Sequence, residues 1–411
     1  MDILTPFGAP FFVTAKAVGS KCNLRCEYCY YLEKSKYYRD VPSHMMSDET
    51  LERFIDDYIS SQPSSEVVFA WHGGESLLRP LSFYEKVLDL QKKYGKGHSI
   101  SNCIQTNGTL LDDKWCRFFH HNKWLVGLSI DGTPEAHDRY RKTPAGHSSF
   151  NKVMHGIQLL NKHRVDWNIL ATVNSFNADR PSETYRFLRS LGTQFIQFTP
   201  VVERFMPDGA LASQHDGGIN VTDFSVTPQQ WGKFICEVFD IWVRSDVGKV
   251  YVQTFDSTLA NWVGATPPVC TMARNCGSAV ALEFNGDVYS CDHFVFPEYY
   301  LGNIHAGSFA QMIFSERQKQ FGKDKRDSLP TKCQACRFLF ACNGECPRNR
   351  FMTTDTGEKN LNYLCEGYYS YFEHVAPYMD FMKRELDFQR PPANVMMAVR
   401  NGMFDNKTNK N

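Results

Sequence analysis

The chain has 411 residues, of which 42% are hydrophobic, so it can bury a large core and is not expected to be disordered. Lys plus Arg equal Asp plus Glu at 45 each, which excludes an overall basic field for nucleic acid or an anionic membrane. Residues 1–20 lack the pattern of a signal peptide, and no segment is apolar for long enough to span a membrane. We therefore expect a cytoplasmic protein that binds neither nucleic acid nor membrane.

Six apolar runs rich in β-forming residues occur in the first half of the chain, and segments of helical periodicity separate them. The runs are Phe11 to Val18, Val67 to Trp71, Asn102 to Gln105, Leu125 to Ile130, Trp167 to Val173 and Phe195 to Thr199. A first helix is predicted after Ser47, since Leu51, Phe54, Ile55, Tyr58 and Ile59 recur with helical spacing. Further helices are predicted at 81–93, 112–122, 150–163 and 181–191. This alternation predicts an α/β fold with a parallel barrel or open sheet.

Polar and glycine residues follow each predicted strand. The group after the first strand is a cysteine loop. The groups after the other five strands are, in order, His72-Gly73-Gly74-Glu75, Thr106-Asn107-Gly108, Ser129-Ile130-Asp131-Gly132, Asn174-Ser175 and Pro200 to Glu203. The need for turn-forming residues at a strand end explains any one of these groups, but it explains polar groups after all six strands less easily. In a βα barrel the loops at the carboxyl ends of the strands meet at one mouth, so we expect the active site there.

The loop after the first strand holds Cys22, Cys26 and Cys29 in a CxxxCxxC spacing. Fourteen cysteines in a chain without a secretion signal favour metal-binding thiolates over disulfides. Three thiolates leave one iron of a [4Fe-4S] cluster open to a small molecule, whereas a structural zinc site needs four protein ligands. The spacing therefore favours a catalytic cluster, with a zinc knuckle that borrows a distant fourth ligand as the alternative.

This motif, with the aromatic residue Tyr28 inside it, resembles the cluster loop of radical S-adenosylmethionine (SAM) enzymes. In such enzymes the open iron chelates the amino and carboxylate groups of SAM, and an electron from the cluster yields a 5'-deoxyadenosyl radical. Gly73-Gly74-Glu75 resembles their GGE motif, in which glycines let backbone carbonyls approach the methionyl ammonium of SAM. The resemblance implies a partial (β/α)6 TIM-like barrel and a SAM site that includes Tyr28, Gly73, Gly74 and Glu75.

Three further residues are candidates for the SAM site. Ser129 and Arg141 carry a hydroxyl and a guanidinium, which suit the carboxylate and ribose of SAM, although each could be an ordinary surface residue. The resemblance favours the SAM role for both. Val202, just past the sixth predicted strand, is a candidate for the adenine environment, although an apolar residue there is more often core.

The second half contains eight further cysteines, enough for two four-iron clusters or, by count alone, for two zinc sites. Their order, with CxxC-x5-CxxxC before a last cysteine, resembles the SPASM extension of peptide-modifying radical SAM enzymes, which binds two auxiliary [4Fe-4S] clusters. The resemblance assigns Cys270, Cys276, Cys291 and Cys346 to auxiliary cluster I, and Cys333, Cys336, Cys342 and Cys365 to auxiliary cluster II. It implies three clusters in all and leaves Cys103, Cys116 and Cys236 as inert core thiols.

Within this group the chain resembles the anaerobic sulfatase-maturating enzymes. The shared motifs are Gln105-Thr106-Asn107-Gly108, Leu128 to Gly132, Ser290 to Phe294 and Cys342 to Cys346. Those enzymes oxidise a Cys or Ser of an unfolded sulfatase to Cα-formylglycine. Asp292 corresponds to their proposed proton acceptor, and enclosure near the substrate is expected to raise its pKa. The alternatives are His293 as the base, or an Asp292 that only binds turn amides.

Two other functions stay open from sequence. The chain could be another SPASM maturase, such as one that forms thioether crosslinks, although we expect no peptide-recognition domain before Cys22. It could also be a non-catalytic zinc-ribbon protein, which would hold zinc in place of about twelve irons. The resemblance implies as partners an unfolded sulfatase with a Cys/Ser-X-Pro/Ala-X-Arg motif and an electron donor such as flavodoxin or ferredoxin. Ser and Cys targets are not distinguished.

The expected domain organisation follows from these assignments. A radical SAM partial barrel is expected at 1–227 and a linking helix region at 228–262. The SPASM auxiliary-cluster domain is expected at 263–370, before a C-terminal helix and a polar tail at 371–411.

Overall fold

The computed structural model describes residues 10–38, 43–206, 212 and 220–405. The chain forms two compact units, and each unit combines separate stretches of sequence. The first unit contains 1–129, 140–167 and 275–324, and the second contains 130–139, 168–274 and 325–411. The polar tail predicted at 406–411 lies outside the described residues.

The first unit is built on a sheet with strand order β10-β9-β8-β1-β2-β3-β4. The bounds are β1 Phe12–Lys16, β2 Glu66–Trp71, β3 Ser99–Thr106, β4 Leu125–Ser129, β8 Ala279–Glu283, β9 Asp287–Tyr289 and β10 Tyr300–Asn303. Strands β1 to β4 are parallel, as predicted for a βα repeat. Strand β9 is antiparallel to both of its neighbours.

Strand β8 joins this sheet from the cysteine-rich half of the chain, beyond the six strands that the sequence predicts. It runs parallel to β1, and its register extends from Phe12 opposite Ala279 to Lys16 opposite Glu283. A run of five residues is too short to be separated from a loop by periodicity, and its partner strand is remote in sequence. The pairing places the segment after β8 close to the cysteine loop that follows β1.

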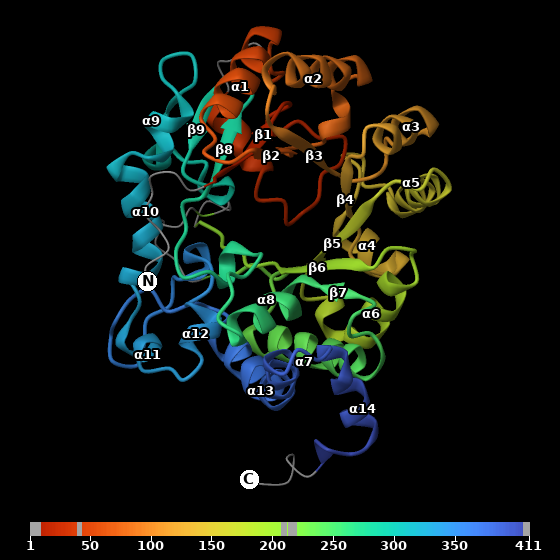
Figure 1. The fold of residues 1–411 in the computed structure, drawn as a ribbon, viewed down its shortest axis with the longest axis vertical. Coiled ribbons are helices and arrows are strands. Elements are labelled where there is room, and N and C mark those ends of the chain that lie inside the picture. Colours follow the sequence, from red (N-terminus) through yellow and green to blue (C-terminus); the bar gives the residue numbers. More distant parts are fainter. Residues whose placement is uncertain (1–9, 39–42, 207–211, 213–219, 406–411) are drawn as a thin grey trace. The chain divides into compact units, whose positions relative to one another are not determined.

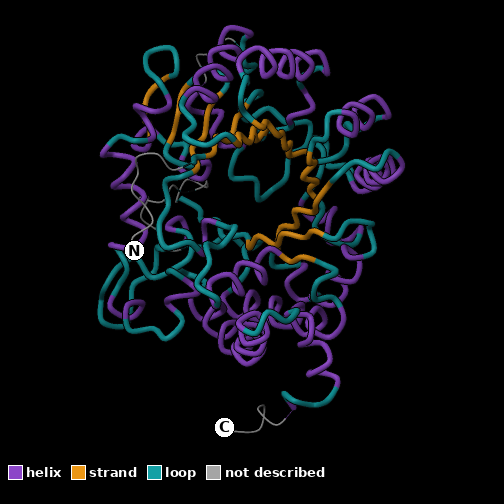
Figure 2. Tube along the Cα trace, viewed as in Figure 1, coloured by secondary structure: helices purple, strands orange, loops and turns teal. Residues whose placement is uncertain are grey.

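Helices α1 and α2 cover β1, β2 and β3 in the first unit (Figures 1 and 2). The bounds are α1 Asp48–Ser60, α2 Leu81–Tyr94, α3 Asp113–His121, α5 Phe150–Lys162, α9 Phe309–Ile313 and α10 Glu316–Asp327. The first helix begins as predicted, because the Ser47 hydroxyl accepts the Thr50 N–H at 3.0 Å. The predicted apolar face of α1 is buried, and the ring of Phe54 lies 5.5 Å from that of Phe69 on β2.

The second unit combines parallel strands β5 and β6 with a short strand β7 beside β6 and a group of helices. The strands are β5 Trp167–Val173, β6 Phe195–Pro200 and β7 Tyr251–Val252. The helices are α4 Pro134–Tyr140, α6 Pro181–Arg189, α7 Pro228–Ser245, α8 Gln253–Trp262, α11 Thr331–Gln334, α12 Leu339–Cys342, α13 Cys365–Asp387 and α14 Val395–Arg400.

Helices α7 and α13 lie side by side in the second unit (Figure 1) and meet at a pair of glycines. A Cβ atom added at Gly232 would lie 3.0 Å from the Cα of Gly367. A Cβ added at Gly367 would lie 2.2 Å from the carbonyl oxygen of Pro228. Neither glycine has a positive φ, so the close approach of the two backbones, rather than the conformation, excludes a side chain.

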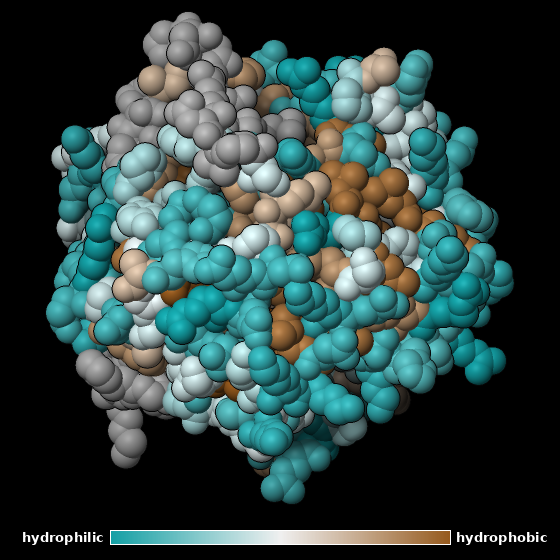
Figure 3. Space-filling view, turned by 90° about the horizontal axis from the view of Figure 1, so that it is seen from above, coloured by the Kyte–Doolittle hydropathy of each residue, from teal (hydrophilic) through white to brown (hydrophobic). Residues whose placement is uncertain are grey.

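No described helix is long and apolar enough to cross a membrane. The face of the molecule in Figure 3 is mostly hydrophilic, and its hydrophobic side chains gather in separate areas. Among the described residues, large apolar side chains with high exposure include Phe388 at 69%, Met397 at 63% and Met403 at 56%.

We expect Gly367→Ala to lower the free energy of unfolding by about 1–3 kcal/mol, because the new methyl group overlaps the Pro228 carbonyl and pushes the helices apart. Denaturant unfolding of the anaerobic protein measures this change. Ser370→Ala on the same helix is the control, since the side chain is exposed and a change below about 0.5 kcal/mol is expected. Equal midpoints for the two variants would contradict the tight helix contact.

Candidate active site

The cysteine loop of residues 22–29 is fastened to the segment after α4 by backbone hydrogen bonds. The Arg25 N–H donates to the Lys142 carbonyl at 2.7 Å, and the Glu27 N–H donates to the Tyr140 carbonyl at 3.2 Å. These bonds hold a loop that has no regular secondary structure of its own. The loop after the first strand is thus tied to the chain that contains Arg141.

Gly73 and Gly74 follow β2 and pack against the chain that leads into the cysteine loop. The Gly74 N–H donates to the Gly19 carbonyl at 2.8 Å, and the Glu75 N–H donates to the Lys21 carbonyl at 2.8 Å. A Cβ atom at Gly74 would lie 1.8 Å from the Lys21 oxygen, which no side chain can tolerate. Gly73 has a φ of +130°, a conformation that favours glycine. The glycines are therefore required by the packing of the cysteine loop.

Glu75 is fully buried, and its carboxylate accepts three hydrogen bonds. The donors are the Thr106 hydroxyl at 2.7 Å, the Asn107 N–H at 2.7 Å and the Leu77 N–H at 3.0 Å. Burial raises the pKa of Glu75, and these donors oppose the rise. The side chain thus joins the end of β2 to the end of β3, and its oxygens point into the protein.

Asn107 contacts the first cysteine of the loop, a role that the sequence analysis missed. Its Nδ2 lies 3.7 Å from Cys22 Sγ and 2.8 Å from Asn23 Oδ1, and the Leu24 N–H donates to Cys22 Sγ at 3.3 Å. Burial raises the pKa of Cys22 to about 11, so loss of its proton requires a metal or an equivalent charge. N–H groups directed at sulfur fit a thiolate that binds an iron–sulfur cluster.

Tyr28 and Arg141, two of the predicted SAM residues, lie together. Tyr28 is buried and its ring makes an edge contact with Tyr140 at a centroid distance of 6.0 Å. The Arg141 guanidinium carbon lies 5.5 Å from the centroid of the Tyr28 ring. Tyr28, which lies inside the cysteine motif, and Arg141, which follows α4, are therefore in contact in the first unit.

The remaining SAM candidates are divided between the two units. Ser129 ends β4, and its hydroxyl accepts a hydrogen bond from Gln105 Nε2 at 2.9 Å. Val202 follows β6 and is buried in the second unit. The first unit holds the other candidates, which are Tyr28, Gly73, Gly74, Glu75, Ser129 and Arg141.

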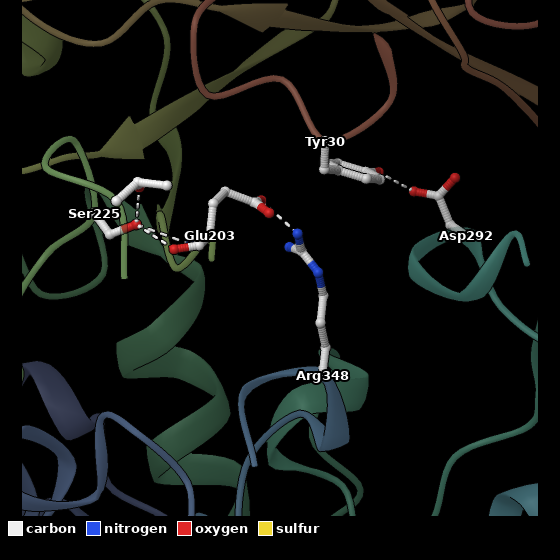
Figure 4. Close-up of polar contacts among 6 residues, drawn as sticks. Tyr30, Glu203, Ser225, Asp292 and Arg348 are labelled. Carbon is white, nitrogen blue, oxygen red and sulfur yellow. Dashed lines mark hydrogen bonds and ion pairs between the residues drawn. The ribbon is translucent and has the colours of Figure 1, made fainter. Parts of the chain in front are cut away.

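Asp292 begins a short 3-10 helix, Asp292–Phe294, and faces the cysteine loop in the first unit (Figure 4). The Tyr30 hydroxyl donates to its Oδ2 at 2.6 Å. Its Oδ1 forms an ion pair with the Lys16 ammonium. The Lys16 side chain is completely buried, whereas the Asp292 side chain keeps 23% exposure. The carboxylate is thus held on both oxygens, and Oδ1 is itself buried although the side chain as a whole keeps some exposure.

The prediction that enclosure raises the pKa of Asp292 is wrong. Burial alone would raise it, but the Lys16 ammonium, with smaller contributions from His72 and His293, holds the pKa well below its usual range. The sequence analysis did not single out Lys16, because a lysine at the end of an apolar strand has no motif around it. Asp292 is therefore ionised at neutral pH.

Two further buried titratable groups surround Lys16. Burial, with help from the Lys16 charge, lowers the pKa of His72 to about 4, so the ring is neutral at pH 7. Glu283 lies opposite Lys16 in the sheet and accepts a hydrogen bond from the Tyr31 hydroxyl. Burial raises the pKa of Glu283 to about 7. The carboxyl end of β1 therefore carries a buried cluster of charged and polar groups.

In the second unit, the four cysteines predicted to bind auxiliary cluster II line one pocket of about 320 Å³. They are Cys333, Cys336, Cys342 and Cys365, and the aromatic residues Phe338, Tyr368 and Phe372 line the same pocket. Burial raises the pKa of Cys333 to about 11 and that of Cys342 to about 12. Thiols of this kind lose their protons on metal binding, and the pocket has room for a cluster, so the residues fit one.

The four cysteines predicted for auxiliary cluster I are divided between the units. Cys276 and Cys291 belong to the first unit, and Cys270 and Cys346 belong to the second. Their grouping rests on the resemblance. Within the part of the chain that the structure describes, no three or more His, Cys, Asp or Glu side chains lie close enough together to hold a single metal ion, and this includes the cysteines of the auxiliary cluster II pocket.

A buried lysine lies beside Cys270. The Lys325 ammonium donates to three backbone carbonyls, those of Cys270 at 2.6 Å, Thr271 at 2.8 Å and Ala273 at 2.5 Å. The side chain is completely buried, and it fixes the turn that carries Cys270. It also brings a positive charge to a predicted thiolate ligand.

Glu203, at the end of the sixth predicted strand, forms an ion pair with Arg348 within the second unit (Figure 4). Its N–H donates to the Ser225 hydroxyl at 2.8 Å. The carboxylate is nearly buried, so this pair joins the loop after β6 to the cysteine-rich segment. Glu203 is therefore occupied in a structural contact.

Two family models match the chain. The radical SAM superfamily matches residues 17–188, and the SPASM iron-sulfur cluster-binding domain matches residues 270–337. The chain is 60% identical over 403 residues to the serine-type anaerobic sulfatase-maturating enzyme of Bacteroides thetaiotaomicron, with 97% of each chain covered. It is 32% identical to the cysteine-type anaerobic sulfatase-maturating enzyme of Clostridium perfringens, with 90% of this chain and 97% of the relative covered.

A solved structure described as native anSMEcpe with bound AdoMet and Cp18Cys peptide is 30% identical to the chain. It matches with a TM-score of 0.82 and covers 92% of this chain and 100% of its own. The sheet, the cysteine motifs and these matches define a radical SAM enzyme with a SPASM domain, which uses SAM and iron–sulfur clusters. Within that class, the chain belongs to the anaerobic sulfatase-maturating enzymes. The predicted fold class and family are confirmed.

We expect Gly74→Ala to lose most of the iron that the cysteine loop holds, because the new Cβ would overlap the Lys21 carbonyl and push the loop away from β2. Iron and sulfide assays after anaerobic reconstitution, with the electron paramagnetic resonance of the reduced protein, measure the loss. Gly307→Ala is the control, since its Cβ would lie 3.1 Å from Gln311 Oε1 and 3.7 Å from Met312 Cε, which are side-chain atoms rather than backbone. Wild-type iron content in Gly74→Ala would refute the positioning of the loop by this contact.

Proposed function

We propose that this enzyme oxidises a serine residue of an unfolded sulfatase to Cα-formylglycine, with SAM as cosubstrate. The observation that carries the proposal is the 60% identity, over 97% of both chains, to a serine-type enzyme, against 32% to a cysteine-type one. The proposed target motif is Ser-X-Pro/Ala-X-Arg. The peptide bound in the solved structure of a relative supports a peptide segment as substrate.

We propose three [4Fe-4S] clusters. The radical cluster would be held by Cys22, Cys26 and Cys29, auxiliary cluster I by Cys270, Cys276, Cys291 and Cys346, and auxiliary cluster II by Cys333, Cys336, Cys342 and Cys365. With SAM and the reduced radical cluster bound there, the site would supply radical chemistry able to take a hydrogen atom from the Cβ of the target residue. Asn107 and the Leu24 N–H stabilise the Cys22 thiolate, and their contacts with its sulfur support this assignment.

The proposed SAM site combines backbone and side-chain groups. Carbonyls of Gly73 and Gly74 accept hydrogen bonds from the SAM ammonium, and Glu75 holds their segment against β3 through Thr106 and Asn107. The other proposed SAM residues are Tyr28, Ser129, Arg141 and Val202. The contact of Arg141 with the Tyr28 ring, close to the cluster cysteines, supports a role for both.

Asp292 is the proposed proton acceptor for the hydroxyl of the target serine. Its ionised state, its two fixed oxygens and its position directly after the proposed cluster ligand Cys291 support this role. A carboxylate of low pKa is a weak base, so it would take the hydroxyl proton as the substrate radical passes its electron to an auxiliary [4Fe-4S] cluster and the hydroxyl becomes strongly acidic. His293, whose ring lies 5.2 Å from that of Tyr30, is the alternative base.

An electron donor such as flavodoxin or ferredoxin and a cytoplasmic location stay predictions. A reducing compartment protects iron–sulfur clusters and thiols, and no disulfide joins the cysteines of the described residues. Reduction of the clusters by purified flavodoxin or ferredoxin tests the donor.

The function is tested with anaerobically reconstituted enzyme, SAM, a reductant and two peptides that differ only by Ser or Cys at the target position. We expect the serine peptide to lose two hydrogen atoms by mass spectrometry and to form the aldehyde. A peptide with alanine at the target is the control. Oxidation of the cysteine peptide alone would overturn the serine assignment, and no change in either peptide with intact clusters would overturn the function.

We expect Asp292→Asn to keep SAM cleavage and to slow peptide oxidation by about 10²- to 10⁴-fold, the usual contribution of a general base. Formation of 5'-deoxyadenosine and of formylglycine, measured in the same reaction, separates the two steps. Asp89→Asn on the exposed face of α2 is the control. Full formylglycine yield in Asp292→Asn would remove Asp292 from this role and leave His293.

A further inference from the structure

Lys16 is a buried cation with a defined set of partners. It ends β1, and its side chain has no solvent exposure. Its ammonium forms an ion pair with Asp292 Oδ1, lies 2.9 Å from His72 Nδ1 and lies 4.5 Å from the centroid of the Tyr31 ring. Burial of a lone ammonium is costly, so these partners are what keep it in place.

The contacts of His72 fix the tautomer of its ring. The Gly73 N–H donates to Nδ1 at 2.8 Å, and the Lys16 ammonium, which has only donors, lies at the same nitrogen. A nitrogen that accepts carries no proton, so the neutral ring has its proton on Nε2. Lys16 therefore helps to turn His72 into a hydrogen-bond donor at Nε2.

The same ammonium fixes the orientation of Asp292. Lys16 holds Oδ1 and the Tyr30 hydroxyl holds Oδ2, so rotation of the carboxylate would break one contact or the other. Lys16, His72 and Asp292 come from the ends of three different segments, namely β1, β2 and the turn after β9. The Lys16 side chain thus contacts both Asp292, the proposed proton acceptor, and His72, which precedes the Gly73-Gly74 pair.

We propose that Lys16 is a positioning residue for peptide oxidation, which holds the Asp292 carboxylate and the Nε2–H tautomer of His72 in one fixed arrangement. The proposal rests on the proposed function, because it assigns Lys16 to the step after SAM cleavage. If Lys16 were only structural, its loss would lower SAM cleavage and peptide oxidation together. If Lys16 is a positioning residue, its loss lowers peptide oxidation and leaves SAM cleavage unchanged.

The first experiment compares Lys16→Met and Lys16→Arg in the reconstituted holoenzyme with the serine peptide. We expect Lys16→Met to form 5'-deoxyadenosine within about twofold of wild type, and the formylglycine made per deoxyadenosine to fall by about 10- to 100-fold. Lys16→Arg keeps the charge and should recover part of this ratio. Lys162→Met, which removes an exposed ion pair with Asp113, is the matched control and should leave the ratio unchanged.

An unchanged ratio in Lys16→Met, or an equal fall of both products, would overturn the proposal.

A second measurement does not depend on whether a variant at position 16 folds. Nitrogen-15 magnetic resonance of histidine-labelled wild-type holoenzyme should show an unprotonated Nδ1 and a protonated Nε2 for His72, assigned by comparison with His72→Gln. The opposite tautomer would also overturn the proposal. Failure of wild-type enzyme to form formylglycine would instead count against the proposed function, and the two failures are therefore distinct.

Discussion

The close packing of Gly74 on the Lys21 carbonyl is the contact on which the cysteine loop depends. It allows two backbone hydrogen bonds between the end of β2 and the chain before Cys22. The Glu75 carboxylate accepts a hydrogen bond from the Asn107 N–H at the end of β3. The Asn107 side-chain amide in turn lies against the sulfur of Cys22. A loop without secondary structure is thus fixed by the strand ends around it, as a catalytic cluster requires.

Local signals in the sequence were enough to predict the α/β repeat and to identify the cysteine motifs. Ser47 and the apolar face that follows it define a helix within a few residues, and the CxxxCxxC spacing needs no tertiary information. The pairing of β8 with β1 could not be found in this way. Its five residues carry little periodicity, and the contact joins segments from opposite parts of the chain. Non-local strand pairing is decided by the whole sheet rather than by either segment.

The same limit explains the errors within the candidate site. The low pKa of Asp292 depends on Lys16, which comes from the other end of the sequence. Asn107 stood in a recognised motif, but its contact with Cys22 appears only when β3 lies beside β2. Glu75 stays a predicted SAM residue from its motif, and the structure adds that its carboxylate is bonded to the neighbouring strand end. Sequence identified the chemical groups, and the fold determines which atoms of each group remain available.

Helix α13 begins at Cys365, a proposed cluster ligand, and two residues later Gly367 is pressed against α7. Iron bound at the proposed cluster would therefore add a tie at the first turn of the last long helix, beside its contact with α7. A chain that loses this iron to air would lose the tie at Cys365, and the buried face of α13 against α7 would then hold the helix alone.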